Sequence, residues 1–232
     1  MSEALEPGQR GIVWKGVGLS YPGPPVVEAL RPTDLGLEPG AYVAITGPSG
    51  SGKSTLLNVL GLLDRSTTGR FLLDGVDVTH CRDADQAELR ARSFGFVFQR
   101  FHLLPTLSAR ENVELSLMYA GARPSERRDL AAAALERVGL SDRWSHRPTE
   151  LSGGEQQRVA IARAIVRDQQ FLLADEPTGS LDSRTAASVL DLLESLASDG
   201  RGVIHVTHNE SVAHRASRRL HVLDGVVSEG DR

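Results

Sequence analysis

Short apolar runs alternate with amphipathic segments along most of the chain. The apolar runs that predict buried strands are Ile12 to Leu19, Tyr42 to Thr46, Phe94 to Phe98, Phe171 to Ala174 and Val203 to Thr207. The segments whose apolar residues recur at helical spacing are Lys53 to Leu63, Leu130 to Val138, Gln156 to Val166 and Thr185 to Leu196. Because strands alternate with helices, the pattern predicts an α/β fold built around a parallel sheet.

Two Asp-Gly pairs add an antiparallel component to this prediction. Asp74-Gly75 and Asp224-Gly225 each sit between apolar, strand-like runs. Both residue types tolerate the positive φ angles of a two-residue hairpin turn. We therefore expect a mixed β-sheet core together with an antiparallel β subdomain.

The stretch from Gln99 to about Glu150 departs from the alternating pattern. It has no strong strand signal, and its alanine- and leucine-rich helical segments are interrupted by proline and glycine. We interpret residues 99–150 as a helical insertion within a single domain at 11–232, preceded by a flexible tail at 1–10. A chain of 232 residues is long enough for one large α/β domain and too short for two with a linker.

Composition narrows the classes of protein to which the chain can belong. Hydrophobic residues at 40% and charged residues at 24% are ordinary for a globular protein, and no apolar stretch approaches the roughly 20 residues needed to cross a bilayer. The acidic, polar start lacks the features of a secretory signal, which favours a cytoplasmic protein. A net charge of -4 argues against nucleic acid as a partner. The single cysteine, Cys81, can form neither an internal disulfide nor a zinc site of its own.

The clearest chemical motif is a phosphate-binding loop between an apolar run and a helix. The residues that fit the P-loop pattern are Gly47, Pro48, Ser49, Gly50, Ser51, Gly52, Lys53 and Ser54, followed by Thr55. Glycines let backbone N–H groups approach phosphate oxygens, and the start of the following helix adds its positive dipole end. Lys53 is expected to neutralise the β and γ phosphates, and Ser54 to offer a hydroxyl ligand to Mg²⁺. The alternative, a flexible glycine-serine linker, needs neither the flanking strand and helix nor the lysine.

Two adjacent carboxylates end the apolar run Phe171 to Ala174. Asp175 and Glu176 thus lie at the carboxyl end of a predicted strand, where open α/β sheets bind their ligands. Asp175 is suited to holding Mg²⁺ through its water shell, and Glu176 to accepting a proton from the water that attacks the γ-phosphate. A pair of solvated acids at a strand end is the alternative, which loses weight beside a P-loop.

A third motif, residues 151–158, begins a predicted helix and reads Leu-Ser-Gly-Gly-Glu-Gln-Gln-Arg. Ser152 and Glu155 have the spacing of a capping box. A cap leaves Gly153 and Gly154 unexplained, because glycine weakens a helix unless something such as a phosphate must approach the backbone. Beside the P-loop and the two carboxylates, this motif resembles the signature motif of the ABC ATPase family.

Further positions strengthen the resemblance to the ABC ATPases, whose fold is a P-loop NTPase core. These positions are, in chain order, Tyr21, Gln99, Asp182 and His208. The resemblance implies that the tyrosine stacks on adenine and that the glutamine senses Mg²⁺ and the attacking water. It also implies that the aspartate lies in a loop crossing a dimer interface and that the histidine contacts the γ-phosphate. Taken alone, the tyrosine could simply be buried and the histidine could simply end a strand.

In this family two chains enclose two ATP molecules, each held by the P-loop of one chain and the signature serine of the other. The resemblance therefore implies that Ser152 acts on ATP bound to a second copy of this chain or to a related ATPase chain. It also implies an integral membrane permease as partner, ATP and Mg²⁺ as cofactors, and ATP hydrolysis as the reaction. The expected location is peripheral, on the inner face of the cell membrane.

Within the family, three segments are similar to the lipoprotein-releasing and macrolide-exporter branch, with the cell-division ATPase nearby. They are Phe98 to Pro105, residues 111–113 and Asp175 to Gly179. The chain departs from this branch at Ser180, where asparagine is usual, and at Asn209, where aspartate is frequent. Neither departure replaces a catalytic group, but both leave the substrate open.

Two other functions stay open at this point. Some members of the branch use ATP to transmit a mechanical signal that regulates cell-wall hydrolases. DNA-maintenance ATPases share the two-chain arrangement, but they insert a long coiled coil between the P-loop and the signature. The segment between Lys53 and Ser152 carries no heptad repeat, which disfavours that class.

Overall fold

The computed structural model describes residues 10–118 and 122–230. The strands in this part of the chain are β1 (Ile12–Tyr21), β2 (Val27–Leu37), β3 (Tyr42–Thr46), β4 (Thr68–Leu73), β5 (Val76–Asp77), β6 (Phe94–Phe98), β7 (Phe171–Asp175), β8 (Gly202–Val206), β9 (Arg218–Leu223) and β10 (Val226–Glu229). The helices are α1 (Lys53–Leu60), α2 (Asp83–Ser93), α3 (Ala109–Met118), α4 (Pro124–Arg137), α5 (Gly153–Ile165), α6 (Ser183–Ser198) and α7 (Glu210–Ala213). Two short 3-10 helices lie at Ser141–Arg143 and Pro148–Glu150.

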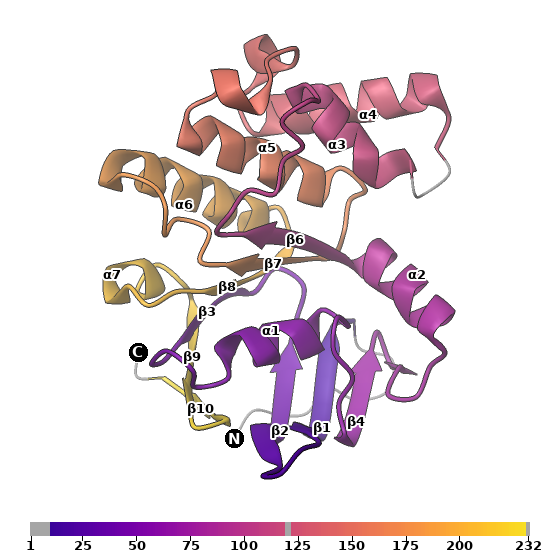
Figure 1. Ribbon diagram of the computed structural model, residues 1–232, viewed down its shortest axis with the longest axis vertical. Coiled ribbons are helices and arrows are strands. Elements are labelled where there is room, and N and C mark those ends of the chain that lie inside the picture. Colours follow the sequence, from indigo (N-terminus) through magenta and orange to yellow (C-terminus); the bar gives the residue numbers. More distant parts are fainter. Residues whose placement is uncertain (1–9, 119–121, 231–232) are drawn as a thin grey trace.

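A six-stranded mixed sheet in the order β10-β9-β3-β8-β7-β6 forms the centre of the structure. Its strands pair in parallel except for β10, which pairs antiparallel with β9. Figure 1 shows α5 and α6 on one side of this sheet and α1 on the other. The predicted α/β class and the mixed sheet are confirmed.

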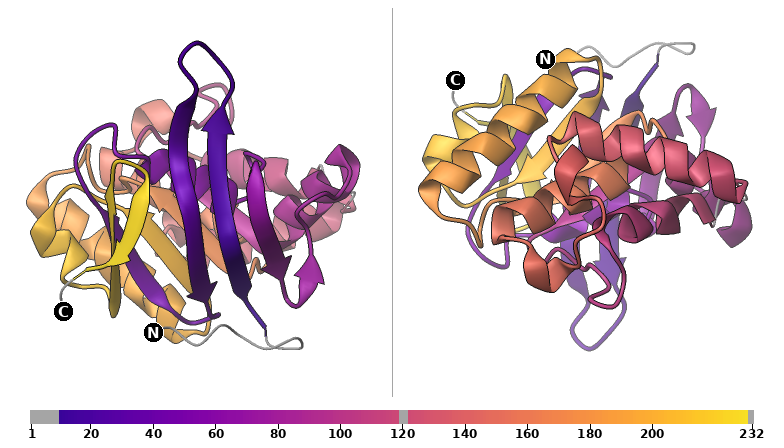
Figure 2. Two further views of the ribbon diagram at one scale, coloured as in Figure 1. Left: turned by 90° about the horizontal axis from the view of Figure 1, so that it is seen from below. Right: turned by 90° about the horizontal axis from the view of Figure 1, so that it is seen from above.

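A second sheet has four antiparallel strands in the order β2-β1-β4-β5. It lies on the same side of the main sheet as α1 (Figures 1 and 2). Both predicted hairpin turns are present: φ is 50° at Asp74 and 77° at Gly75, and it is 49° at Asp224 and 76° at Gly225. The expected antiparallel β subdomain is confirmed.

The strand β2 is absent from the sequence prediction. It contains Pro32, and proline cannot donate a hydrogen bond to a sheet ladder. The structure tolerates this residue because β2 is the outermost strand of its sheet, next to β1. Pro32 therefore lies in an edge strand and not in a loop.

Two predicted helix boundaries are wrong. The helix α1 ends at Leu60 rather than Leu63, because Gly61 caps its C-terminus. The helix α4 begins at Pro124 rather than Leu130, since proline is favoured in the first turn, where its missing N–H would be unpaired in any case. The other predicted strands and helices are present, with boundaries that differ by a few residues.

The predicted helical insertion corresponds to α3, α4 and both 3-10 helices, and its described residues contain no strand. That residues 99–150 are an insertion within one domain at 11–232 stays a prediction. Residues 1–9 of the expected tail lie outside the described residues. None of the described helices is both long and apolar enough to cross a membrane.

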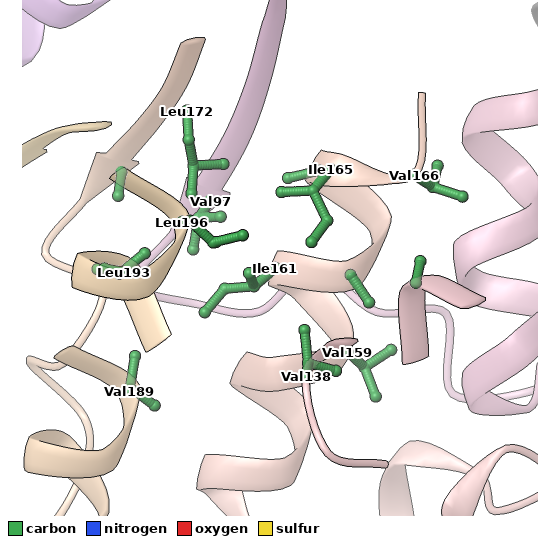
Figure 3. Close-up of a cluster of buried hydrophobic side chains, with 14 of the residues drawn as sticks. Val97, Val138, Val159, Ile161, Ile165, Val166, Leu172, Val189, Leu193 and Leu196 are labelled. Atoms are coloured by element: carbon green, nitrogen blue, oxygen red, sulfur yellow. The ribbon is translucent and has the colours of Figure 1, made fainter. Parts of the chain in front are cut away.

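The main sheet buries apolar side chains on both of its faces. One cluster lies among the sheet and the helices α3 to α6 and includes Leu172, and the other lies toward α1 and the second sheet and includes Leu173. These two neighbours in β7 enter opposite clusters because side chains alternate across a strand. Figure 3 shows the first cluster, with Leu172 and Val97 of the sheet above Ile161 of α5.

Truncating a side chain in the first cluster should destabilise the protein. Leu172 is completely buried, whereas Leu130 on α4 is 38% exposed. We expect Leu172→Ala to lower the free energy of unfolding by about 2–5 kcal/mol, because it leaves a cavity that the sheet cannot close. Urea unfolding followed by circular dichroism measures this, with Leu130→Ala as the matched control. Equal losses for the two variants would contradict this description of the core.

Candidate active site

The P-loop connects β3 to α1 at one edge of the main sheet. Gly47 has a φ of 140°, and a Cβ atom there would lie 2.1 Å from the Val222 carbonyl oxygen. Gly52 is the N-cap residue of α1, with a φ of 106°. Both positions require glycine, so the loop follows a path in which its N–H groups and the start of α1 are available to an anion.

Lys53, the first residue of α1, lies within the loop. Its side chain is buried, and Nζ donates hydrogen bonds to the carbonyl oxygens of Gly47 at 2.9 Å and Pro48 at 2.6 Å. The Ser51 hydroxyl is also buried and has no hydrogen-bond partner among the described residues. The P-loop therefore contains the positive charge of Lys53 and the unpaired hydroxyl of Ser51, and both suit the binding of a phosphate group.

A cavity of about 690 Å³ opens over the P-loop. Its lining includes the predicted site residues Gly47, Ser49, Gly50, Ser51, Gly52, Lys53, Ser54, Thr55, Asp175, Glu176 and His208. These residues lie at or after the carboxyl ends of β3, β7 and β8, which meet on one side of the sheet because the strands run parallel. The structure thus brings together the P-loop, the two adjacent carboxylates and His208, which are far apart in the sequence.

Asp175 ends β7 beside the start of α1. The Ser54 hydroxyl donates to its Oδ2 at 3.5 Å. Burial and the neighbouring Glu176 charge raise the pKa of Asp175, while the Ser54 hydrogen bond and the Lys53 charge act in the opposite direction. A carboxylate and a hydroxyl in this position are oxygen ligands that suit Mg²⁺, and a cation there would favour the ionised form of Asp175.

Glu176 points toward His208, which follows β8. The Glu176 carboxylate Oε1 lies 2.9 Å from His208 Nδ1. Glu176 has a φ of 45°, a backbone conformation that residues other than glycine seldom adopt. Gln99 approaches the same place, since a Cβ on Gly179 would lie 2.9 Å from Gln99 Nε2 and 3.2 Å from Glu176 Oε2. The Glu176 carboxylate therefore has the His208 imidazole on one side and the Gln99 amide near it.

Tyr21 lies at the end of β1, outside the residues that line the cavity. It is 41% exposed, so the alternative of a buried tyrosine is wrong. Its hydroxyl donates to Asp64 Oδ2 at 3.1 Å. Partial burial and this carboxylate raise the pKa of Tyr21, while a hydrogen bond with Thr55 of the P-loop opposes the shift. The exposed ring of Tyr21 is therefore available for stacking.

The signature segment, residues 151–158, does not line the cavity. Its capping box is present: the Glu155 N–H donates to Ser152 Oγ at 3.3 Å, and the Ser152 N–H donates to Glu155 Oε2 at 2.8 Å. The hydrogen bonds from Ser152 lower the pKa of Glu155. Ser152 itself is exposed.

The structure gives Gly154 a packing role within the chain. A Cβ atom at this position would lie 2.1 Å from Thr185 Cγ2 in α6, so the glycine is required by packing within the chain. That a phosphate also approaches the backbone at Gly154 stays a prediction. Gly153 has a looser contact, since a Cβ atom there would lie 3.3 Å from Leu181 Cδ2. Asp182 caps α6 and accepts from the Thr185 N–H at 3.1 Å, so the start of α5 and the loop before α6 are packed together.

One part of the cavity lining is not predicted by the sequence motifs. This part is formed by Val27, Glu28, Ala29 and Arg31 of β2 together with Asp224 and Gly225. The Asp224-Gly225 turn is hydrogen-bonded to the P-loop, because the Gly225 N–H donates to the Ser51 carbonyl oxygen at 2.9 Å. The Asp-Gly pair predicted the turn, but no local signal placed it in the site, since its position depends on the pairing of β9 with β3.

The chain is similar to known ABC transporter proteins over most of its length. The model of the ABC transporter family matches residues 30–179. The macrolide export ATP-binding/permease protein MacB of Rhodopseudomonas palustris is 54% identical over 218 residues, which are 93% of this chain and 33% of that relative. The chain therefore spans about a third of the length of this relative. The uncharacterized ABC transporter ATP-binding protein YknY of Bacillus subtilis is 48% identical over 213 residues, 90% of this chain and 93% of that protein.

Solved structures agree with the sequence relatives. A dimeric, post-hydrolysis structure of the ATP-binding cassette MJ0796 bound to ADP and Pi has a TM-score of 0.83 and 39% identity, covering 94% of this chain and 98% of that chain. A second dimeric structure of MJ0796, a bacterial ABC transporter cassette, has a TM-score of 0.83 and 40% identity.

Removing the buried lysine charge should weaken the binding of a nucleoside triphosphate. We expect Lys53→Ala to raise the Kd for ATP by about 10- to 100-fold, because a hydrogen bond to a charged group contributes roughly 1.5–3 kcal/mol. Equilibrium binding of a fluorescent ATP analogue measures the effect. The chain's other lysine, Lys15, is exposed in β1, and Lys15→Ala is the matched control. Unchanged affinity in Lys53→Ala would contradict the assignment of the cavity.

Proposed function

The chain belongs to the ABC transporter family, and on this premise we propose that it binds ATP in the cavity over its P-loop and hydrolyses it to power a membrane transporter. The observation that carries this proposal is the convergence of Lys53, Asp175 and the Glu176–His208 pair on one cavity. A phosphate-binding loop alone is common to many nucleotide-dependent enzymes. The Glu176 carboxylate paired with the His208 imidazole, in the same cavity as the phosphate-binding loop, indicates hydrolysis.

The predicted site residues have distinct roles in this proposal. The P-loop N–H groups and Lys53 bind the phosphates. Phosphate oxygens then take the place of the two carbonyl oxygens to which Lys53 donates in this structure. Ser54 and Asp175 would hold Mg²⁺, with Gln99 as the further predicted ligand, and the ion would supply positive charge that offsets the charge of the phosphates. Tyr21 offers its exposed ring to the adenine.

Hydrolysis transfers the γ-phosphoryl group to water. The water oxygen forms a bond to the γ-phosphorus, the bond from that phosphorus to the β–γ bridging oxygen breaks, and ADP and phosphate leave. Glu176 accepts a proton from the water or orients it, and His208 holds the carboxylate through the 2.9 Å contact. Most of the rate comes from placing these groups before the reaction begins.

One chain forms half of each hydrolytic site. Ser152 and Asp182 are exposed and do not line the cavity of their own chain. We infer that two chains associate face to face, so that Ser152 of each reaches the ATP held by the other. The dimeric MJ0796 structures, one of them with ADP and Pi, support this arrangement. The partner chain is a second copy or a related ATPase.

The remaining partner in the proposal is a membrane permease, which places the chain on the inner face of the cell membrane. The name of the macrolide export relative, an ATP-binding/permease protein, supports this combination. ATP favours the closed pair of chains and ADP the open pair, and the permease responds to that difference. An export function in the macrolide-exporter branch is the one that the relatives favour.

Replacing the proposed base should separate ATP binding from hydrolysis. We expect Glu176→Gln to bind Mg-ATP and to form a stable dimer, while turnover falls by about 100-fold or more, because the amide cannot accept the proton. Phosphate release and solution mass by light scattering measure the two effects. Glu88→Gln, on the exposed face of α2, is the control and should match the unmodified protein. A Glu176→Gln protein that stays monomeric with ATP, or hydrolyses it at full rate, would contradict the proposal.

A further inference from the structure

The turn that carries Glu176 has an unusual backbone conformation. A non-glycine residue at a φ of 45° keeps that conformation only when its surroundings hold it in place. Two backbone hydrogen bonds do so: the Glu176 N–H donates to the Val206 carbonyl at 3.1 Å, and the Gly179 N–H donates to the Glu176 carbonyl at 3.1 Å. Pro177, the next residue, has a carbonyl that accepts a third bond from a different part of the chain.

That third bond comes from Gln157 in α5. The Gln157 side chain is completely buried, and its Nε2 donates to the Pro177 carbonyl oxygen at 2.6 Å. The orientation of the amide follows from chemistry, since only its nitrogen can donate to a carbonyl. The other amide atom, Oε1, is buried without a hydrogen-bond partner among the described residues.

The unpaired oxygen distinguishes this residue from an ordinary core side chain. A buried polar atom without a partner lowers stability, so a methionine of similar length would fill the same space at a smaller cost. Packing alone therefore does not account for an amide here. What the amide provides, and methionine cannot, is the donor that fixes the carbonyl next to Glu176.

The position of Gln157 connects this bond to the signature segment. Gln157 lies one turn into α5, which Ser152 caps, and the start of α5 packs tightly against α6 through Gly154 and Thr185. A displacement of the signature segment would therefore reach the turn at Pro177 through the buried Gln157 side chain.

We propose that Gln157 is a positioning residue for hydrolysis: it fixes the Glu176 turn and couples the signature segment of a chain to the carboxylate of the same chain. This inference rests on the proposed function. Gln157 does not contact ATP or the attacking water; it acts through Pro177 on the direction of the Glu176 carboxylate. Nucleotide affinity, which depends on the P-loop, should not require it.

The first test removes the donor and keeps the volume. We expect Gln157→Met to lower kcat by about 10- to 100-fold, because small misplacements of a reacting group have effects of this size. The KM for ATP and the Kd of a fluorescent ATP analogue should stay unchanged. The control is Gln169→Met, because Gln169 is also buried with an unpartnered Oε1 but lies before the opposite, N-terminal end of β7.

The second test restores the donor by pH. A carboxyl introduced by Gln157→Glu can donate to the Pro177 carbonyl when it is protonated and repels that carbonyl when it is ionised. Burial raises the pKa of a carboxyl, so protonation should occur within the range in which the protein is folded. We expect the kcat of Gln157→Glu, divided by that of the unmodified protein, to rise as the pH falls from about 8.5 toward about 6. The same ratio for Gln157→Met should be flat.

The inference is overturned if Gln157→Met turns over ATP as fast as Gln169→Met, if its loss lies in KM, or if the Gln157→Glu ratio does not change with pH. Should Gln157→Met fail to fold, the pH dependence within folded Gln157→Glu still decides. Failure of the proposed function is separate, because it would leave the unmodified protein and Gln169→Met without ATP hydrolysis.

Discussion

The parallel pairing of β3, β8 and β7 is the constraint on which the site depends. In this register Ile45 of β3 and Asp175 of β7 both lie opposite Val206 of β8, so the segments that follow the three strands leave the sheet at one edge. The P-loop, the two carboxylates and His208 are those segments. Because apolar side chains on both faces of the sheet are buried in separate clusters, the register cannot slip without exposing them. The stability of the core and the geometry of the cavity thus have the same origin.

A second level of organisation connects the cavity to the surface that a partner chain would cover. The start of α5 packs against α6 through Gly154, and Gln157 bonds to the turn after Glu176. Ser152 therefore belongs to a helix that is fixed to the carboxylate of its own chain while facing outward. In the proposed dimer each chain would then supply a base to one ATP and a signature serine to the other. A rigid connection between the two would make the sites respond to one another.

Much of this arrangement could be predicted from the sequence, because the signals are local. The P-loop spacing, the strand ending in Asp175-Glu176 and the Asp-Gly hairpin turns each depend on a few adjacent residues. What the sequence could not predict depends on contacts between distant segments. The strand β2 was hidden by Pro32, which is acceptable only at an edge. The sequence also did not reveal that Gly154 packs against Thr185, because this contact follows from the packing of α5 on α6. The β2 part of the cavity lining was missed on the same grounds.

The central claim, that each hydrolytic site is shared between two chains, is tested most directly by mixing two inactive variants. Lys53→Ala removes the phosphate-binding charge and Ser152→Ala removes the signature hydroxyl, so each pure protein should hydrolyse ATP at a small fraction of the normal rate. In a mixed dimer one site combines both defects, but the other combines an intact Lys53 with an intact Ser152 of the opposite chain. Shared sites predict that the mixture regains activity well above the sum of the two separate proteins. A mixture no more active than that sum, with both variants folded and dimeric, would contradict them.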